Sequence, residues 1–332
     1  MKIGIISTGA VIGEIIESND ALEKKVSNYD PGISNKSLDE LLQQRYGIKS
    51  RAKTNRLPSD MASEACMHAI KKANVAVSEI DFLILNTTSG DHIQPTTATK
   101  VQKLIGMRED SFAMELNMPC AGNIYGLATA YSYIKTGIGK MGLVVGVDRM
   151  TTIVDREDFF TAGMFGDGAS ACLVGENPAY IIKDIFLKSR ADEEITLGIK
   201  SSGSAYPITE DSVKKKDHLL TMKGNNTADF IHETVQETIR YLLKKSKLQI
   251  NQLDQLIIHQ ASKVLITKAV KALGFNDSQL AFTVEKYGNT SSASVLLTLD
   301  DYLINSPNAK NIFLIGMGSG LNWGGIYLKR KL

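Results

Sequence analysis

The sequence has few cysteines, no block of like charge and no long apolar run. Its three cysteines, Cys66, Cys120 and Cys172, are widely spaced, and no pair has the spacing of metal ligands. This pattern argues against a disulfide framework and against a metal site, and it favours a reducing compartment. The formal net charge is +2, from 38 basic and 36 acidic residues, which gives no support to nucleic-acid binding or to a polybasic membrane contact.

The absence of a long apolar run also bears on location. No stretch approaches the roughly 18 apolar residues that a transmembrane helix needs. The segment from Met1 to Ser7 has the pattern of a short apolar strand and lacks an A-x-A cleavage site. We therefore expect a cytoplasmic protein with no membrane span. With 332 residues, 43% of them hydrophobic, the chain has material for about two domains or one large one.

Cys120 stands in the most informative local pattern of the chain. It follows a strand-like run, Ser111 to Leu116, and Pro119, and it precedes a helical pattern with small residues on one side. This order predicts a sharp strand-to-helix turn beside a helix N-terminus. Free backbone N–H groups and the positive end of the helix dipole favour a thiolate there, and a thiolate on a tight turn is presented as a nucleophile. The alternative for a single cysteine is a buried structural role.

Two parts of the chain repeat one pattern. Residues 78–86 resemble residues 251–259, and each segment is followed by a helical pattern, a Gly-containing elbow and a helix rich in small residues. After that helix, residues 142–146 match residues 311–316. Strands that alternate with helices predict an α/β fold with a largely parallel sheet. Corresponding elbows of two such halves are expected to meet at the carboxyl ends of strands, where open α/β sheets place their sites.

The repeat predicts two similar halves related by a pseudo-twofold axis. We assign residues 1–175 to the half with the cysteine and residues 176–332 to the half with the later elbow. Residues 176–224 look irregular, with edge strands at most, and residues 226–246 have the pattern of a long helix.

The repeat also brings polar residues into corresponding places. Cys120 and the Gly288–Asn289 elbow correspond, and His259 ends a predicted strand, so the three side chains are expected in one pocket. A thiolate with an imidazole and an amide donor suits acyl transfer, because the donors stabilise negative charge that develops on oxygen. The glycine loop at 316–320 follows a strand and offers backbone N–H groups for an oxyanion hole. Without the repeat, the sequence around His259 would indicate a core histidine, and residues 287–290 would indicate a turn.

These residues resemble the thiolase superfamily, and most closely the β-ketoacyl-acyl-carrier-protein synthase III family. The resemblance runs over nearly the whole chain and implies a five-layer αβαβα fold and a homodimer with active sites near its interface. It is carried by six motifs, at Pro119–Gly122, Phe165–Ala169, Thr221–Asn225, His259–Ala261, Tyr287–Ser291 and Gly318–Gly320 with Trp323–Gly324.

The resemblance implies roles for individual residues. Cys120 is acylated by an acyl-CoA or an acyl-carrier-protein thioester, and no other cofactor is implied. His259 and Asn289 then bind the thioester carbonyl of a malonyl-carrier protein, help it lose CO₂ and stabilise the enolate. The N–H groups of Cys120 and Ser319 form the oxyanion hole. The implied substrate-binding residues are Arg45, Phe165, Asn225, Ser262, Gly318 and Gly320.

The sequence departs from the family where the acyl donor is recognised. Leu41 and Phe159 replace the tryptophan and arginine that sandwich the coenzyme A adenine, and Val264 replaces an arginine implicated in carrier-protein docking. Gln94 replaces a phenylalanine that closes the partner's acyl pocket, and the loop at 28–36 is longer than usual. These changes predict a specialised member, in secondary metabolism or unusual primer synthesis, whose donor arrives on a carrier protein.

Related enzyme classes can be separated by single residues. A degradative thiolase needs a second cysteine in the loop at 316–323, which has none, and hydroxymethylglutaryl-CoA synthases use a glutamate in the role of Asn289. Plant-type polyketide synthases carry proline in the glycine loop, and the signature of papain-like proteases is absent. Two alternatives stay open. One is a cysteine acyltransferase that passes the acyl group to an oxygen or nitrogen nucleophile without decarboxylation, and the other is a non-catalytic subunit of a heterodimer.

Overall fold

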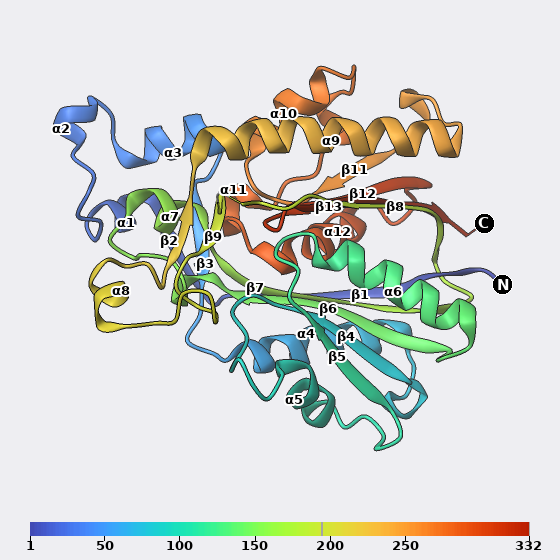
Figure 1. The fold of residues 1–332 in the computed structure, drawn as a ribbon. Helices are drawn as coiled ribbons and strands as arrows, with labels where there is room; N and C mark the ends of the chain where they lie inside the picture. Colours follow the sequence, from blue (N-terminus) through green and yellow to red (C-terminus); the bar gives the residue numbers. More distant parts are fainter. Residues whose placement is uncertain (194, 332) are drawn as a thin grey trace.

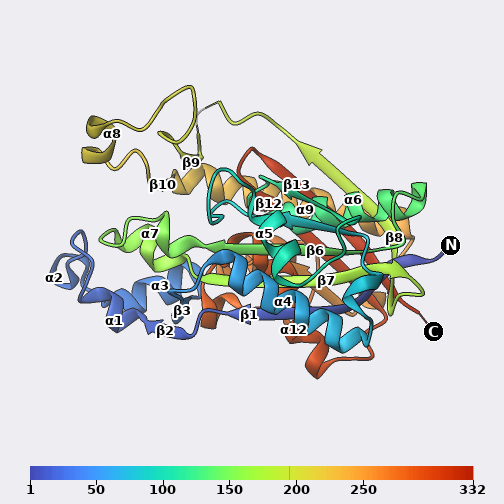
Figure 2. The same ribbon diagram turned by 90° about the horizontal axis from the view of Figure 1, so that it is seen from below.

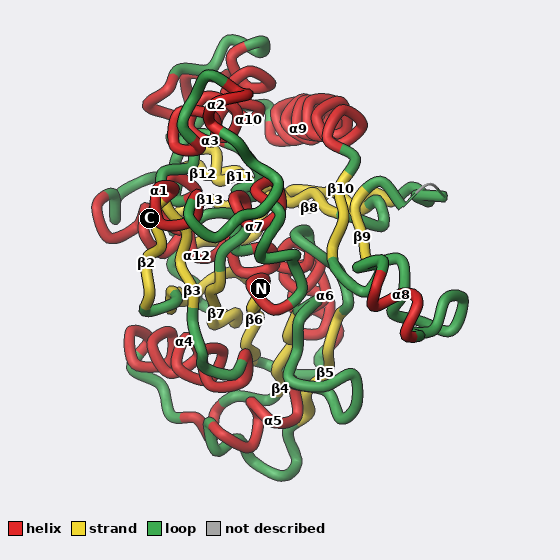
Figure 3. Tube along the Cα trace, turned by 90° about the vertical axis from the view of Figure 1, so that its left-hand side faces the viewer, coloured by secondary structure: helices red, strands yellow, loops and turns green. Residues whose placement is uncertain are grey.

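The protein is built in five layers. The computed structural model describes residues 1–193 and 195–331, without the side chains of residues 224 and 225. Two sheet layers enclose the helices α6 (Gly122–Thr136) and α12 (Ser294–Asn305), as Figure 1 shows. One outer face is covered by α4 (Pro58–Ala73) and α5 (Thr97–Leu104), and the other by α9 (Gly224–Ser246) and α10 (Lys263–Lys271). This is the αβαβα arrangement that the resemblance implies, and Figure 3 shows the same succession of layers from the side.

The two sheet layers are hydrogen-bonded into one succession of strands. Among the described residues its order is β11-β12-β13-β8-β1-β7-β6-β4-β5. The two layers join only between β1 and β8, through the pairs Gly4–Ile181 and Ile5–Tyr180. The strands are β1 (Ile3–Ile12), β4 (Phe82–Asn86), β5 (Phe112–Leu116), β6 (Met141–Arg149), β7 (Asp167–Glu176), β8 (Tyr180–Ser189), β11 (Gln255–Ile258), β12 (Asn311–Gly318) and β13 (Asn322–Arg330).

Shorter elements surround one end of these sheets. The helices are α1 (Asn19–Glu23), α2 (Pro31–Ser34), α3 (Leu38–Tyr46), α7 (Phe159–Met164), α8 (Glu210–Lys214) and α11 (Val284–Tyr287). The strands β2 (Ile15–Ser18) and β3 (Ser50–Lys53) pair with each other, as do β9 (Leu197–Ile199) and β10 (Leu220–Met222). Figure 2 shows α1, α2, α7 and α8 at the end of the molecule opposite to both termini.

The prediction of a largely parallel sheet is wrong. Only the β4–β5, β4–β6 and β11–β12 pairs are parallel, and the other five pairings are antiparallel. One reason is that the chain passes from β12 directly to β13 through residues 319–321, and so short a connection joins antiparallel neighbours. The other is that β1, from the start of the chain, lies between β7 and β8 and runs opposite to both.

The irregular segment predicted at 176–224 is partly regular. β8 (Tyr180–Ser189) is an inner strand of the sheet, with β1 on one side and β13 on the other. Its first residues are buried and its last residues are exposed, so its sequence lacks the continuous apolar run of a buried strand. The pairing with β1 and β13, which come from opposite ends of the chain, decides its conformation.

The repeated sequence segments form equivalent elements. Each of β4 and β11 is preceded by a one-turn 3₁₀ helix, at Val77–Glu79 and Ile250–Gln252, and each is parallel to a strand of its own layer, β6 or β12. α6 and α12 follow the two elbows and pack between the layers, where an apolar core includes Ile84, Leu127 and Val295. The equivalence supports two halves, and the boundary at residue 175, which falls next to the last residue of β7, stays a prediction. In the part of the chain described, no helix is long and apolar enough to cross a membrane.

Candidate active site

Cys120 lies at a sharp turn immediately before α6. Its φ is +64°, and the Ala121 N–H donates to the Pro119 carbonyl oxygen at 2.6 Å, which closes a three-residue γ-turn. Such a backbone is strained for a residue with a side chain and is found at functional sites. Gly318 at the end of β12 packs directly on this turn, since a Cβ there would lie 1.9 Å from the Pro119 oxygen. The close approach of the end of β12 to the Cys120 turn therefore requires glycine at position 318.

A pocket beside Cys120 collects most of the predicted site residues. It encloses about 590 Å³, including its open mouth, and its lining includes Cys120, His259 and Asn289. Phe165, Ser262 and Gly318 line the same pocket. The remaining wall is largely apolar, with contributions from Tyr46, Phe160, Met164, Leu197, Met222 and Phe230. A nucleophile and two groups able to donate hydrogen bonds thus share one dry, apolar space.

His259 is held by a serine of the central helix α12. The His259 side chain is buried, and its Nδ1 lies 2.6 Å from the Ser294 Oγ. Burial lowers the pKa of His259 to about 3, because a charged imidazolium would lose its hydration in the apolar pocket. The imidazole is therefore neutral at physiological pH.

Asn289 is oriented by its own turn. Its Oδ1 accepts a hydrogen bond of 2.8 Å from the Ser291 N–H, so the other end of the amide, Nδ2, is the end available to the pocket. The Asn289 backbone pairs with the segment that carries Phe165, through Asn289 N–H to Met164 O at 2.8 Å and Gly166 N–H to Asn289 O at 3.0 Å. Asn289 thus presents donor hydrogens, and it fixes the neighbouring wall as well.

A second pocket meets the first at Cys120. It encloses about 960 Å³, including open solvent, and it is lined by Cys120, Ser291 and Ser319 on one side and by Ile93, which is 89% exposed, on another. The Ser291 Oγ lies 3.5 Å from the Cys120 Sγ. Within residues 1–193 and 195–331, the backbone N–H groups of Cys120 and Ser319 have no hydrogen-bond acceptor. Two residues that line this pocket therefore carry a free backbone donor.

The prediction of a thiolate at Cys120 is wrong for the free protein. Burial raises the pKa of the Cys120 thiol to about 12, although a hydrogen bond with Ser291 acts in the opposite direction, and the charge of Asp148 raises it further. The thiol is 5% exposed and faces an apolar pocket, so the loss of hydration outweighs the helix N-terminus. Cys66 and Cys172 are buried in the core, as expected of structural cysteines.

Two predicted residues, Arg45 and Gly320, lie apart from the pocket. The Arg45 side chain is exposed on α3, although its carbonyl oxygen accepts a 3.5 Å hydrogen bond from Ser262 and its neighbour Tyr46 lines the pocket. Gly320, with φ +129°, shapes the turn between β12 and β13 and lines neither pocket. The Asn225 side chain lies outside the described residues.

Sequence reasoning missed the hydroxyl groups that contact the reactive side chains. Ser294 was not singled out, and Ser291 appeared only as the end of a motif. A signal existed, since the run Ser291-Ser292-Ala293-Ser294 follows Asn289 directly and small residues allow close approach. The pairing of Ser291 with Cys120 and of Ser294 with His259 depends on the conformation of the turn that leads into α12. In this turn Ser291 has a positive φ of +47°, which the sequence does not indicate.

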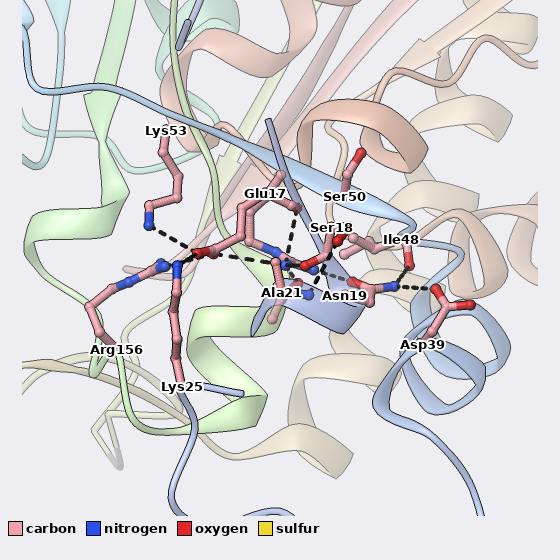
Figure 4. Close-up of polar contacts among 12 residues, drawn as sticks. Glu17, Ser18, Asn19, Ala21, Lys25, Asp39, Ile48, Ser50, Lys53 and Arg156 are labelled. Atoms are coloured by element: carbon pink, nitrogen blue, oxygen red, sulfur yellow. Dashed lines mark hydrogen bonds and ion pairs between the residues drawn. The ribbon is translucent and has the colours of Figure 1, made fainter. Parts of the chain in front are cut away.

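A buried ionic cluster supports the wall behind Asn289. Figure 4 shows Lys25, Lys53 and Arg156 converging on the carboxylate of Glu17, at 2.7, 3.1 and 2.8 Å. Next to it, the fully buried Arg51 donates from Nε to the carbonyl oxygen of Gly163, at the end of α7, at 3.2 Å. The cluster therefore ties the β2–β3 hairpin to the segment that carries Phe165.

We expect Glu17→Gln to destabilise the protein above about pH 4. Burial alone would raise the Glu17 pKa, but hydrogen bonds from Lys25 and Lys53 and the charge of Arg156 outweigh it and lower the pKa to about 2. A lowered pKa stabilises the fold above the unfolded value of about 4.3, and that contribution disappears as pH falls through 2. Denaturant unfolding at pH 7 should show a loss of about 3 kcal/mol. An unchanged unfolding free energy from pH 7 to pH 3 in both proteins would contradict this assignment.

Two family profiles match the chain. The profile described as 3-Oxoacyl-[acyl-carrier-protein (ACP)] synthase III matches residues 114–191, and the one described as its C terminal matches residues 243–330. The beta-ketoacyl-[acyl-carrier-protein] synthase III of Fusobacterium nucleatum is 32% identical over 331 residues, which cover 99% of this chain and 98% of that protein. The chain belongs to the 3-oxoacyl-acyl-carrier-protein synthase III family. It is a condensing enzyme of the acyltransferase class, as the sequence analysis predicts.

Other members of the synthase III family agree in sequence and in fold. The enzyme of Chlamydia trachomatis is 30% identical over 336 residues, which cover 99% of this chain and all of that protein. The synthase III of Aquifex aeolicus, whose crystal structure is known, is 29% identical in sequence. The two structures align with a TM-score of 0.85 over 98% of this chain and 99% of that one. The structure from Pseudomonas aeruginosa has a TM-score of 0.88 at 24% identity over 100% and 99% of the two chains, and it supports the fold.

The described residues contain no group of three or more His, Cys, Asp or Glu side chains arranged to hold a metal ion. The reactive and polar groups that the site offers are the Cys120 thiol, the His259 imidazole, the Asn289 amide and backbone N–H donors.

Proposed function

We propose that this enzyme loads an acyl group onto Cys120 and condenses it with a malonyl unit carried by an acyl carrier protein, giving a β-ketoacyl thioester. The observation that carries the proposal is the pocket in which Cys120, His259 and Asn289 meet. It places a nucleophile in one pocket with two hydrogen-bond donors, and no Lys or Arg is among the described residues of its lining. Such a site suits chemistry in which the charge to be stabilised lies on an oxygen.

In the first half-reaction the Cys120 sulfur attacks the carbonyl carbon of the acyl donor. The new bond is the S–acyl bond, the bond that breaks joins the acyl group to the donor sulfur, and the thiol proton leaves with that sulfur. Burial raises the pKa of the Cys120 thiol to about 12 in the free protein, so the thiol must lose its proton in the course of the reaction. The free N–H groups of Cys120 and Ser319 supply donors for the oxyanion of the tetrahedral intermediate.

In the second half-reaction the malonyl thioester occupies the pocket of His259 and Asn289. Its carboxylate faces a wall that includes Phe165, and the described residues of that wall offer no positive charge, which favours loss of CO₂. The electron pair of the broken C–C bond moves onto the thioester oxygen, where the two side chains stabilise the enolate. The enolate carbon then attacks the acyl carbon on Cys120. The C–S bond breaks, and the departing thiolate takes up one proton.

The acyl carrier protein requires a docking surface near the pocket mouth. A groove between α3 and α10 is lined by Lys49, Lys263 and Lys268 and continues next to Ser262 of the pocket. The lysines are partly paired, since Lys263 and Lys49 lie 2.9 and 3.7 Å from Glu285. We assign this groove to an acidic carrier protein, because surface lysines attract such a partner over several ångströms.

The long loop at 28–36 favours a donor that arrives on a carrier protein. It packs against the start of α7, where the rings of Tyr29 and Phe159 lie 5.2 Å apart and the Asn28 amide donates to Asp158 at 2.8 Å. The loop also lines a surface pocket with Leu41 and Phe159, the two positions that replace the adenine-sandwiching tryptophan and arginine of the family. These replacements support a specialised role that uses a carrier-bound primer.

The exposed edge of the sheet favours a homodimer. β5 is an end strand of the sheet, its Phe112 side chain is 36% exposed, and an unpaired strand edge readily pairs with another chain. Ile93, at the rim of the second pocket, is exposed as well, so a partner subunit placed here would close that pocket. Sedimentation velocity should give twice the chain mass of 36.2 kDa, and a monomer at micromolar concentration would contradict the assignment.

The test of the proposed function is intact-protein mass spectrometry followed by CO₂ measurement. We expect the wild-type protein to gain the mass of one acyl group from a panel of acyl-CoAs and acyl-carrier proteins, and to release CO₂ from malonyl-carrier protein in step with β-ketoacyl product. Loading without CO₂ release would indicate transfer to an oxygen or nitrogen nucleophile. No adduct from any donor would indicate a non-catalytic subunit. Equal or better turnover with acetyl-CoA than with any carrier-protein donor would overturn the assignment of the donor.

A further inference from the structure

We infer that Ser294 is a positioning residue, which donates its hydroxyl hydrogen to His259 Nδ1 and so keeps the ring proton on Nε2, the nitrogen available to the pocket. Only the expected effect of Ser294 on decarboxylation rests on the proposed function. The tautomer itself is a property of the free protein.

The hydrogen-bond geometry decides the direction of donation. Ser294 is fully buried, and its Oγ has two partners among the described residues, the Gln260 N–H at 3.4 Å and His259 Nδ1 at 2.6 Å. The Gln260 N–H is a donor, so it uses the oxygen of Ser294 as acceptor. The only acceptor left for the Ser294 hydrogen is Nδ1, and a buried hydroxyl without an acceptor is costly.

The tautomer decides what His259 does. A neutral imidazole carries one proton, and its position is set by the hydrogen bond of the other nitrogen. Nδ1 accepts from Ser294, so Nε2 bears the hydrogen, and this nitrogen has no partner within the described part of the chain. His259 is therefore a donor to the pocket, like the Asn289 amide, and it is no base for the Cys120 thiol. Both donors are oriented before the substrate binds, so an enolate oxygen meets a prepared site.

Ser292 provides a matched control. It lies two residues before Ser294, it is also fully buried, and its hydroxyl has no hydrogen-bond partner in the structure described. Ser292→Ala removes the same group from the same turn without touching His259. A general effect of losing a buried hydroxyl here would appear in both variants.

The experiment combines ¹⁵N NMR of histidine-labelled protein with separate assays of the two half-reactions. We expect wild-type His259 to show a protonated Nε2 and an unprotonated, hydrogen-bonded Nδ1, with assignment by His259→Gln. Ser294→Ala should move the Nδ1 resonance and slow CO₂ release from malonyl-carrier protein about tenfold or more, while loading of Cys120 stays within about twofold. Ser294→Thr, which keeps the hydroxyl, should recover most of the rate, and Ser292→Ala should match the wild type.

Two results would overturn the inference. One is an NMR spectrum in which the wild-type His259 ring is protonated at Nδ1. This measurement needs neither catalysis nor a folded Ser294→Ala variant. The other is unchanged decarboxylation in folded Ser294→Ala. A wild-type protein that shows the expected tautomer but never releases CO₂ would refute the proposed function and leave the tautomer assignment intact.

Discussion

Cys120→Ser is expected to abolish acyl loading and to lower the rate of condensation by at least about a thousandfold. A serine hydroxyl is a far weaker nucleophile than a thiol unless a base activates it, and His259 is assigned here as a hydrogen-bond donor. The γ-turn, with φ +64°, tolerates serine as well as cysteine, so the fold should survive. Incubation with acyl donors and intact mass measurement should show an adduct on the wild type alone.

Cys66→Ala is the control for this prediction. Cys66 is a free cysteine on the buried face of α4, in an apolar core, and it lines neither pocket. Burial raises the pKa of its thiol, so it is a poor nucleophile as well as an inaccessible one. The control variant should load like the wild type. If Cys120→Ser still gained the mass of an acyl group, and the gain disappeared only when Cys66 was also replaced, the acylated residue would be Cys66.

His259→Ala and Asn289→Ala are expected to load Cys120 normally and to lose decarboxylation by a factor of about 100 to 1,000 each. Each substitution removes one of the two donors assigned to the enolate oxygen. Loading uses the backbone N–H groups of Cys120 and Ser319, which neither substitution changes. Separate measurement of adduct mass and of CO₂ from malonyl-carrier protein distinguishes the two half-reactions.

The pH dependence of these variants provides a further check on His259. The pKa of His259 is lowered to about 3, so its ring is neutral from pH 5 upward, and imidazolium formation should not reduce decarboxylation in that range.

The double variant His259→Ala with Asn289→Ala tests whether both donors act on one oxygen. If they do, its loss of decarboxylation should be smaller than the product of the two single losses. If either single variant decarboxylated at the wild-type rate, that residue would have no part in the site.

Much of the candidate site could be predicted from the sequence because its residues sit at ends of regular elements. Cys120 follows a strand and opens a helix, His259 ends a strand, and the Gly288–Asn289 elbow precedes a helix, and each of these local patterns appears in the structure. The repeat of residues 78–86 at 251–259 added the tertiary information, since equivalent elements of two halves meet at one place. Gly318 was predicted as a substrate-binding residue of the glycine loop, and its packing against the Pro119 backbone was not predicted.

The sequence by itself determined which reactive groups this protein has and that its chain folds as a repeated α/β unit. These follow from side-chain type and from the spacing of apolar residues, which are local properties. Only the tertiary structure decided the protonation of those groups. Burial by elements far apart in the chain keeps the Cys120 thiol and the His259 ring neutral, and Ser294, 35 residues away from His259, selects its tautomer. The mixed strand directions and the inner position of β8 were decided in the same way, because pairing joins strands from opposite ends of the sequence.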